Sequence, residues 1–231
     1  MALDFVSKVR IFARSWNILK NWYLYPLVYF NLIKKSHVIF ETKSGLKLKI
    51  RTGTTDLMVL TNVWLIQEYL HEEFDIKNNH VVLDIGAHIG LFALFASQFC
   101  KKGKIFCFEP IKENYDLLLE NLELNSIQNI VPFNLAVYHD SKKVKMYINA
   151  DEAGHSIFLP SSKSIQVNSI SLKKIFDYNK IDLCDFAKID CEGSEYSIID
   201  SLPLEYLKRI KKMAIEYHFA DSKISSYWKD F

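Results

Sequence analysis

The stretch VVLDIGAHIG at residues 81–90 decides the fold of this chain. An apolar run ends at Asp84 and passes into a loop that carries Gly86 and Gly90. In α/β proteins a strand of this kind leads into a helix, and ligands bind outside the carboxyl ends of such strands. The stretch therefore predicts a ligand site, whose occupant could carry a pyrophosphate, a triphosphate or no phosphate.

The loop fits phosphate binding poorly. A triphosphate loop needs Lys directly after its last glycine, and no Lys follows Gly90. A dinucleotide loop needs a second glycine where the backbone meets the pyrophosphate, but Ala87 and His88 follow Gly86. Glu109 ends the next apolar run, 19 positions past Gly90, where a carboxylate accepts hydrogen bonds from ribose hydroxyls. A ribose without a diphosphate indicates S-adenosylmethionine.

Apolar strands alternate with amphipathic helices from residue 80 onward. Such alternation predicts a mostly parallel, doubly wound sheet with helices on both faces, an α/β fold. The expected strands are 81–86, 105–110, 129–137, 184–190 and 211–218, with further β structure at 143–149 and 165–170. The expected helices are 91–99, 113–125, 170–178 and 195–202. Before them, 1–35 reads as helical, 37–51 as a hairpin, and 55–70 as a helix with Thr55 as N-cap.

Composition limits the classes of function. The chain has 231 residues, 49% hydrophobic, and a formal charge of only +2, which gives no general case for nucleic-acid binding. Residues 1–50 nevertheless hold nine Lys or Arg and two acids, a charge of +7. The four cysteines form no C-x-x-C pair and stand in or beside apolar runs, which favours buried free thiols in a reducing compartment.

The sequence resembles the FkbM-type methyltransferases over about residues 51–218. The most specific shared string is KIDCEGSE at 188–195, and the family usually has Asn where this chain has His88. The resemblance implies a class I methyltransferase (Rossmann-like) fold, S-adenosylmethionine as donor, and O-methylation of acceptors that include sugars and natural products. The other shared strings are RTGTTD (51–56), VLDIGAHIG (82–90), FEP (108–110), NLELN (121–125), LAV (135–137) and IEYH (215–218).

The expected donor site follows from these strings. Gly86 and Gly90 would let the backbone approach the methionine part of the donor. Asp84 could hold the donor's ammonium, directly or through water. Pro110 and Ile111 would flank the adenine. The complete set of expected donor-binding residues is Asp84, Gly86, His88, Gly90, Glu109, Pro110, Ala136 and Asp190.

A hydroxyl acceptor must lose a proton, so a base is expected near the methyl group. His218 and His155 are candidates because imidazole titrates near neutrality. Asp190 joins them because a carboxylate that ends an apolar strand is costly unless it is used. Glu192, Glu195 and Glu216 are expected to bind the acceptor, although Glu195 could instead complement a helix dipole. No metal site is expected.

We expect residues 1–36 to form a basic, aromatic N-terminal helical extension. Residues 37–231 form the methyltransferase domain, with a hairpin and helix at 37–75 and the donor-binding core at 80–218. The longest uncharged stretch near the N-terminus, 21–33, is too short to span a bilayer and contains Pro26. We expect a cytoplasmic protein. Its residues 1–35 could dock on the inner membrane surface, pack on the domain, or contact a second subunit of a homodimer.

The expected function is S-adenosylmethionine-dependent O-methylation of a hydroxyl on a sugar, a glycan, a lipid-linked saccharide or a related small molecule. The alternatives are a nicotinamide-dependent oxidoreductase on a Rossmann domain and a non-catalytic nucleotide-binding domain. An RNA methyltransferase is disfavoured because residues 51–231 are acidic on balance.

Overall fold

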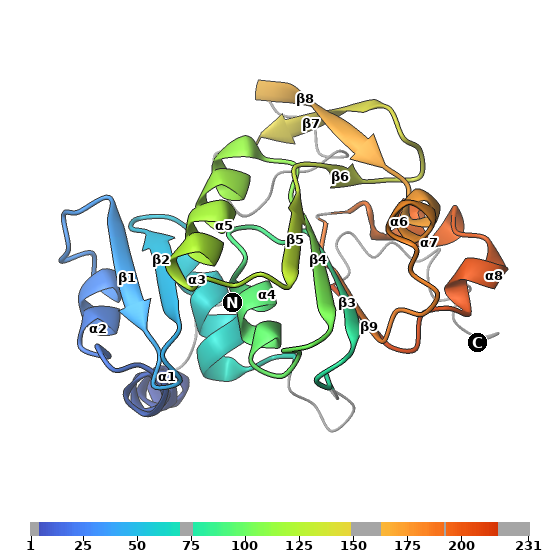
Figure 1. The fold of residues 1–231 in the computed structure, drawn as a ribbon. Coiled ribbons are helices and arrows are strands. Elements are labelled where there is room, and N and C mark those ends of the chain that lie inside the picture. Colours follow the sequence, from blue (N-terminus) through green and yellow to red (C-terminus); the bar gives the residue numbers. More distant parts are fainter. Residues whose placement is uncertain (1–4, 70–75, 149–162, 192, 217–231) are drawn as a thin grey trace.

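A five-stranded parallel sheet forms the centre of the molecule (Figure 1), in a computed structural model that describes residues 5–69, 76–148, 163–191 and 193–216. Its strands lie in the order β10-β9-β3-β4-β5, so the first strand in sequence, β3, stands in the middle. Strand order reverses between β3 and β9, which is where α/β sheets bind ligands. The strands are β3 (Val81–Ile85), β4 (Lys104–Phe108), β5 (Ile130–Phe133), β9 (Phe186–Ile189) and β10 (Met213–Ile215).

Helices cover both faces of this sheet because its strands are apolar on both sides. In β3, Val82 belongs to the core on one face, whereas Leu83 and Ile85 belong to the core on the other. The first face is covered by α4 (Leu91–Ser97) and α5 (Lys112–Leu124). The second is covered by α6 (Leu172–Asn179), α7 (Glu195–Asp200) and α8 (Leu204–Leu207). The predicted doubly wound α/β fold is confirmed.

The N-terminal elements pack on the α4–α5 face. They are α1 (Phe5–Ile18), α2 (Leu24–Tyr29), the hairpin of β1 (His37–Glu41) and β2 (Lys47–Arg51), α3 (Asp56–Leu60) and the π-helix η1 (Thr61–Ile66). The hairpin is the predicted one. Asn121 of α5 and Asn125, the C-cap of that helix, accept from the backbone N–H groups of Lys49 and Lys47, each at 2.7 Å. The two asparagines of the NLELN string therefore hold the free edge of β2.

Two predicted elements are wrong in detail. The expected strand 129–137 is broken after β5, because the Asn134 side chain donates to the carbonyl oxygens of Glu109 and Pro110 at 2.9 and 3.0 Å. The chain then enters a second sheet of order β6-β8-β7, made of β6 (Ala136–Val137), β8 (Lys163–Ile170) and β7 (Lys143–Ile148).

The expected helix 55–70 is also interrupted. It changes from α3 to η1 and ends at Gln67, which is left-handed with φ 60°. Thr55 stands at the N-cap position without a capping hydrogen bond, and the Thr54 hydroxyl accepts from the N–H of Asp56 instead, at 3.2 Å. Across the residues that the structure describes, no helix has the length and apolarity needed to cross a bilayer.

Candidate active site

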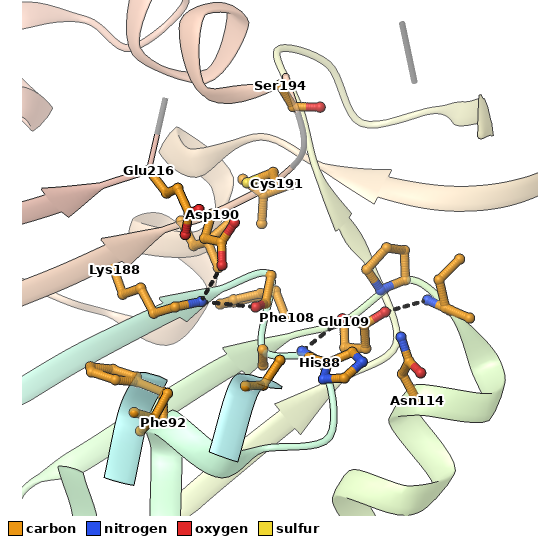
Figure 2. Close-up of a pocket in the computed structure, with 18 of the residues that line it drawn as sticks. His88, Phe92, Phe108, Glu109, Asn114, Lys188, Asp190, Cys191, Ser194 and Glu216 are labelled. Atoms are coloured by element: carbon orange, nitrogen blue, oxygen red, sulfur yellow. Dashed lines mark hydrogen bonds and ion pairs between the residues drawn. The ribbon is translucent and has the colours of Figure 1, made fainter. Parts of the chain in front are cut away.

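A cavity of about 180 Å³ lies at the carboxyl ends of β3, β4 and β9. Lys188 and Asp190 line one side of it, and Glu109 lines the opposite side (Figure 2). Most of the remaining wall is apolar, as is usual for a small-molecule site with a few placed polar groups. The apolar lining consists of Met58, Val59, Val63, Ile85, Ala87, Phe92, Phe108, Pro110, Ile111, Ala136, Val137 and Met146.

The glycine loop after β3 is shaped by contacts within the chain. The N–H groups of Gly86 and Ala87 both donate to the Phe108 carbonyl at 3.0 Å. Gly86 has φ 78°, and a Cβ on it would lie 1.7 Å from the backbone oxygen of Asp190. Gly90 has φ 83°, and a Cβ there would approach Leu118 to 3.0 Å. Gly86 lines the cavity and Gly90 does not, so internal packing explains Gly90 without a donor.

Gly86→Ala tests this packing against Gly45→Ala as a matched control. Both glycines have positive φ, but a Cβ at Gly45 would meet nothing within 4 Å. We expect Gly45→Ala to cost about 1 kcal/mol of unfolding free energy, from backbone strain alone. Gly86→Ala should cost at least about 2 kcal/mol more, because β3 and β9 must separate. Equal urea-denaturation losses for the two variants would contradict the close approach.

Glu109 is held by the backbone of two loops. Its Oε2 accepts from the N–H of His88 and its Oε1 from the N–H of Ile111, each at 2.8 Å. The residue is only 5% exposed yet lines the cavity. Burial raises the pKa of Glu109 to about 7, although these hydrogen bonds work in the opposite direction. A carboxylate offers about four acceptor positions, and the Asn114 side chain takes a third, so one remains for a hydroxyl group.

Lys188 is the functional residue that the sequence reasoning missed. It is buried, and its Nζ lies 3.0 Å from the Gly86 carbonyl oxygen, 3.3 Å from Asp84 and 3.4 Å from Asp190. Burial lowers the pKa of Lys188, but the two carboxylates outweigh it and hold the pKa well above the usual range. A charged residue inside the apolar run FAKI was the available signal, since an unpaired buried ammonium is very costly.

Asp84 lies behind Lys188 and away from the cavity. Its side chain is completely buried, does not line the cavity, and faces Lys188. This position suits a carboxylate that fixes Lys188. Contact of Asp84 with the donor's ammonium, directly or through water, stays a prediction.

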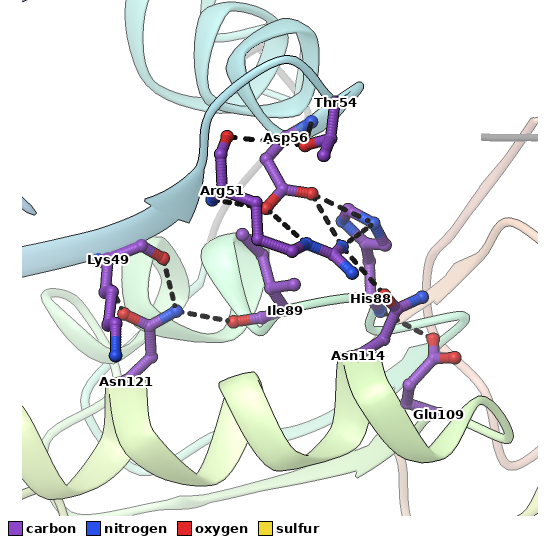
Figure 3. Close-up of polar contacts among 9 residues, drawn as sticks. All are labelled: Lys49, Arg51, Thr54, Asp56, His88, Ile89, Glu109, Asn114 and Asn121. Carbon is purple, nitrogen blue, oxygen red and sulfur yellow. Dashed lines mark hydrogen bonds and ion pairs between the residues drawn. The ribbon is translucent and has the colours of Figure 1, made fainter. Parts of the chain in front are cut away.

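His88 belongs to a polar network that reaches back to the hairpin (Figure 3). Asp56 is fully buried and accepts three hydrogen bonds from Arg51, at 2.8 to 3.0 Å. The Arg51 guanidinium also donates to Asn114 at 2.8 Å and lies 3.4 Å from His88 Nε2. Burial lowers the pKa of His88 to about 4, so the imidazole is neutral near pH 7. The RTGTTD string thus supports His88, whose φ is 51°.

Three carboxylates gather on the Asp190 side of the cavity. Glu68 and Glu216 line it together with Asp190. Burial raises the pKa of Glu68, and the charges of Glu216 and Asp190 raise it further. No pattern singled out Glu68, because it follows the left-handed turn that ends η1. Over the described ranges, no group of three or more His, Cys, Asp or Glu side chains could hold a metal ion.

The residues expected to bind or deprotonate the acceptor lie in different places. Glu195 is fully buried and does not line the cavity, so the expectation that it touches the acceptor is not met. Its Oε1 accepts from the N–H groups of Cys191 and Gly193 at 2.9 and 3.2 Å, which shapes the loop after β9. His155, Glu192 and His218 lie outside the described residues. Pro110, Ala136 and Glu216 line the cavity.

Comparison with known proteins assigns a family. Residues 84–230 match the family model described as a methyltransferase FkbM domain. Methyltransferase sdnD of Sordaria araneosa is 20% identical over 66% of this chain and 71% of its own length. Hexuronic acid methyltransferase AglP of Haloferax volcanii is 21% identical over 68% of this chain and 66% of its own. Methyltransferase FkbM of Methylobacillus flagellatus aligns with TM-score 0.46 and 19% identity over 69% of this chain and 42% of that crystal structure's chain.

Proposed function

Because this chain belongs to the FkbM family of S-adenosylmethionine-dependent methyltransferases, we propose that it methylates a hydroxyl group of a sugar, a glycan, a lipid-linked saccharide or a related small molecule. The proposal is supported most by three carboxylates that line the cavity together, those of Glu68, Asp190 and Glu216. Ionised carboxylates only accept hydrogen bonds, so they suit an acceptor rich in hydroxyl donors. The sugar acceptor of the similar hexuronic acid methyltransferase agrees with this choice.

The S-adenosyl group of the donor would lie on the side of the cavity opposite these three carboxylates. Glu109 keeps an acceptor position for a ribose hydroxyl, while Pro110, Ile111 and Ala136 supply apolar surface for the adenine. The methionine part would lie along the loop of Gly86 and His88. Neutral His88 adds no positive charge beside the sulfonium, and Asp190 supplies a negative one.

The residues of the chain would then orient and deprotonate the acceptor. When bound, the donor supplies an electrophilic methyl group on a charged sulfur. Glu216 and Glu68 would hold neighbouring hydroxyls of the acceptor and so fix its reacting oxygen, which is catalysis by proximity and orientation. Asp190 would receive the hydroxyl proton at a carboxylate oxygen, and its ion pair with Lys188 would orient that carboxylate. His155 and His218 remain the sequence-based predictions for this role.

The affinity for the donor should depend on pH through Glu109. Ribose hydroxyls donate to the carboxylate, so donor binding favours the ionised form, which the free protein holds only above a pKa of about 7. We expect S-adenosylmethionine affinity to fall about tenfold from pH 8 to pH 6, measured by titration calorimetry. In Glu109→Gln the affinity should be lower and this step absent. An identical pH profile in both proteins would contradict the assignment.

The same shift affects the stability of the unliganded fold. Folding raises the pKa of Glu109 from 4.5 to about 7, so protonated Glu109 adds to the free energy of unfolding. This contribution is fully present below pH 4.5 and is lost as the pH rises through about 7.

Activity on hydroxyl acceptors tests the proposal. S-adenosylmethionine labelled on its methyl group is incubated with the protein and hexoses, hexuronic acids and glycolipids. Transfer to a hydroxyl gives an ether that survives mild alkali, whereas a methyl ester on a carboxylate is hydrolysed. Alkali-stable label on a saccharide supports the proposal. Label confined to esters or to amines, with donor binding intact, would refute it.

Exposed aromatic side chains near the N-terminus support the proposal that the protein contacts an anionic lipid surface. Trp16, Tyr23 and Phe30 are 55–60% exposed and stand among basic residues. Deleting residues 1–35 would be a poor test, because Ile11 and Tyr25 belong to the main core. Such aromatic and basic surfaces bind at the membrane interface.

Substitution of two exposed aromatics tests this contact and keeps the core residues Ile11 and Tyr25. We expect Trp16→Ser with Phe30→Ser to weaken binding to phosphatidylserine vesicles about tenfold, through lost apolar burial. Tyr178→Ser, 76% exposed on α6, is the control and should leave vesicle binding unchanged. Equal sedimentation of all three proteins with vesicles would exclude the aromatic contact.

A further inference from the structure

A second cavity of about 270 Å³ lies between the N-terminal helices and the α3–η1 segment. Six of its lining side chains are large and apolar or aromatic, and among the described lining residues only Lys8 carries a charge. The lining consists of Lys8, Ile11, Phe12, Tyr25, Tyr29, Thr54, Leu57, Met58, Thr61 and Asn62.

The α3–η1 segment borders both this cavity and the donor cavity. Its residues repeat at helical spacing, so each of two adjacent faces lines one cavity. Met58 and Asn62 stand on the ridge between the faces and line both cavities. The donor cavity receives Thr55, Met58, Val59 and Asn62, and the second cavity receives Thr54, Leu57, Met58, Thr61 and Asn62.

The walls of the second cavity are fixed by polar contacts. The Tyr25 hydroxyl lies 2.7 Å from Thr61 Oγ1, which joins α2 to η1. Arg14 of α1 donates to the carbonyl oxygens of Leu65 and Ile66 at 2.8 and 2.7 Å, and so satisfies the end of η1. A π-helix at this position fits a functional role, since such turns are frequent at functional sites.

A mostly apolar cavity of this size suits an apolar group, because the removal of apolar surface from water is favourable. The flexible thioether of Met58 can adjust at the boundary between the two cavities.

We infer that the second cavity binds an acyl or isoprenoid chain of the methyl acceptor, which places the acceptor's hydroxyl part in the donor cavity past Met58 and Asn62. The inference rests on the proposed function and narrows its substrate class to lipid-linked acceptors. A chain is favoured over a compact group because α1 and α2, which line the cavity, also carry the exposed Trp16, Tyr23 and Phe30. These helices would meet the lipid from which the chain enters.

Binding of 11-(dansylamino)undecanoic acid to the full chain tests the inference. We expect saturable, one-to-one binding with blue-shifted dansyl emission, retained when S-adenosylhomocysteine fills the donor cavity. Leu57→Trp places an indole in the second cavity and should weaken probe binding about tenfold or more. Val9→Trp, at a half-exposed position of α1 outside the lining, is the matched control and should bind the probe normally.

Each outcome is decisive because S-adenosylhomocysteine binding is measured on the same samples. Displacement of the probe by S-adenosylhomocysteine, unchanged probe affinity in Leu57→Trp, or no saturable probe binding would overturn the inference and leave the methyltransferase proposal intact. Failure of the unmodified chain to bind S-adenosylhomocysteine would instead contradict the proposed function. Should Leu57→Trp lose its thermal transition, Leu57→Phe replaces it, with an intermediate loss expected.

Discussion

Lys188→Met should destabilise the fold by about 3–5 kcal/mol, because it leaves a buried carboxylate without its counter-ion. Lys188 is 5% exposed, and Asp84, 3.3 Å from it, is completely buried. The free energy of unfolding in urea measures the loss. Lys104→Met is the matched control, since Lys104 is an exposed residue of the neighbouring strand β4 and should change stability by no more than about 0.5 kcal/mol.

The double variant Asp84→Asn with Lys188→Met separates charge from packing. Removing both charges removes the unpaired carboxylate, so the double variant should be more stable than Lys188→Met alone. If Lys188→Met lowered the free energy of unfolding by less than about 1 kcal/mol, the ion pair of Lys188 and Asp84 would not stabilise the fold as proposed. A double variant as unstable as the single one would assign the loss to the packing of the Lys188 stem.

Asp190→Asn should lower kcat by about 10²–10⁴-fold, the usual contribution of a positioned base. The substitution keeps the shape of the side chain, and Lys188 keeps Asp84 as its partner, so the fold should be retained. Donor affinity should change little if Asp190 acts on the acceptor's proton. Single-turnover methyl transfer and donor titration together measure the two effects.

Glu216→Gln is the comparison for Asp190→Asn. Glu216 lines the same cavity from the end of β10 and is proposed to hold the acceptor. Its substitution should raise the acceptor KM and leave kcat within a few-fold, the pattern of lost uniform binding. If Asp190→Asn raised only the donor Kd, Asp190 would be a ligand of the donor's ammonium and the base would lie elsewhere.

The sheet and its ligand-binding edge were predictable from local patterns. Apolar strands such as VVLDI and IFCF and amphipathic helices such as 113–125 carry the period of their own structure, which requires no long-range information. Glu109 was found because the spacing from the glycine loop follows from one strand–helix–strand unit. These signals lie within short windows, so the sequence alone was sufficient.

The remaining features depend on contacts between distant segments. Gly86 is required by the Asp190 carbonyl, 104 positions later, and His88 is supported by Asp56, 32 positions earlier. No periodicity reports such pairs. The break at Asn134 depends on a side chain bonding to the end of β4, which only tertiary structure shows. Lys188 is the exception, because a lysine inside an apolar strand was a readable signal for a buried ion pair.

The central claim is that an S-adenosyl group lies across the ends of β3 and β4, with its ribose on Glu109. A crystal structure of the chain with S-adenosylhomocysteine tests it most directly. We expect a ribose hydroxyl oxygen within hydrogen-bond distance of the Glu109 carboxylate, and the donor's sulfur on the side of Asp190. A nucleoside bound elsewhere, or a ribose that makes no contact with Glu109, would contradict the account.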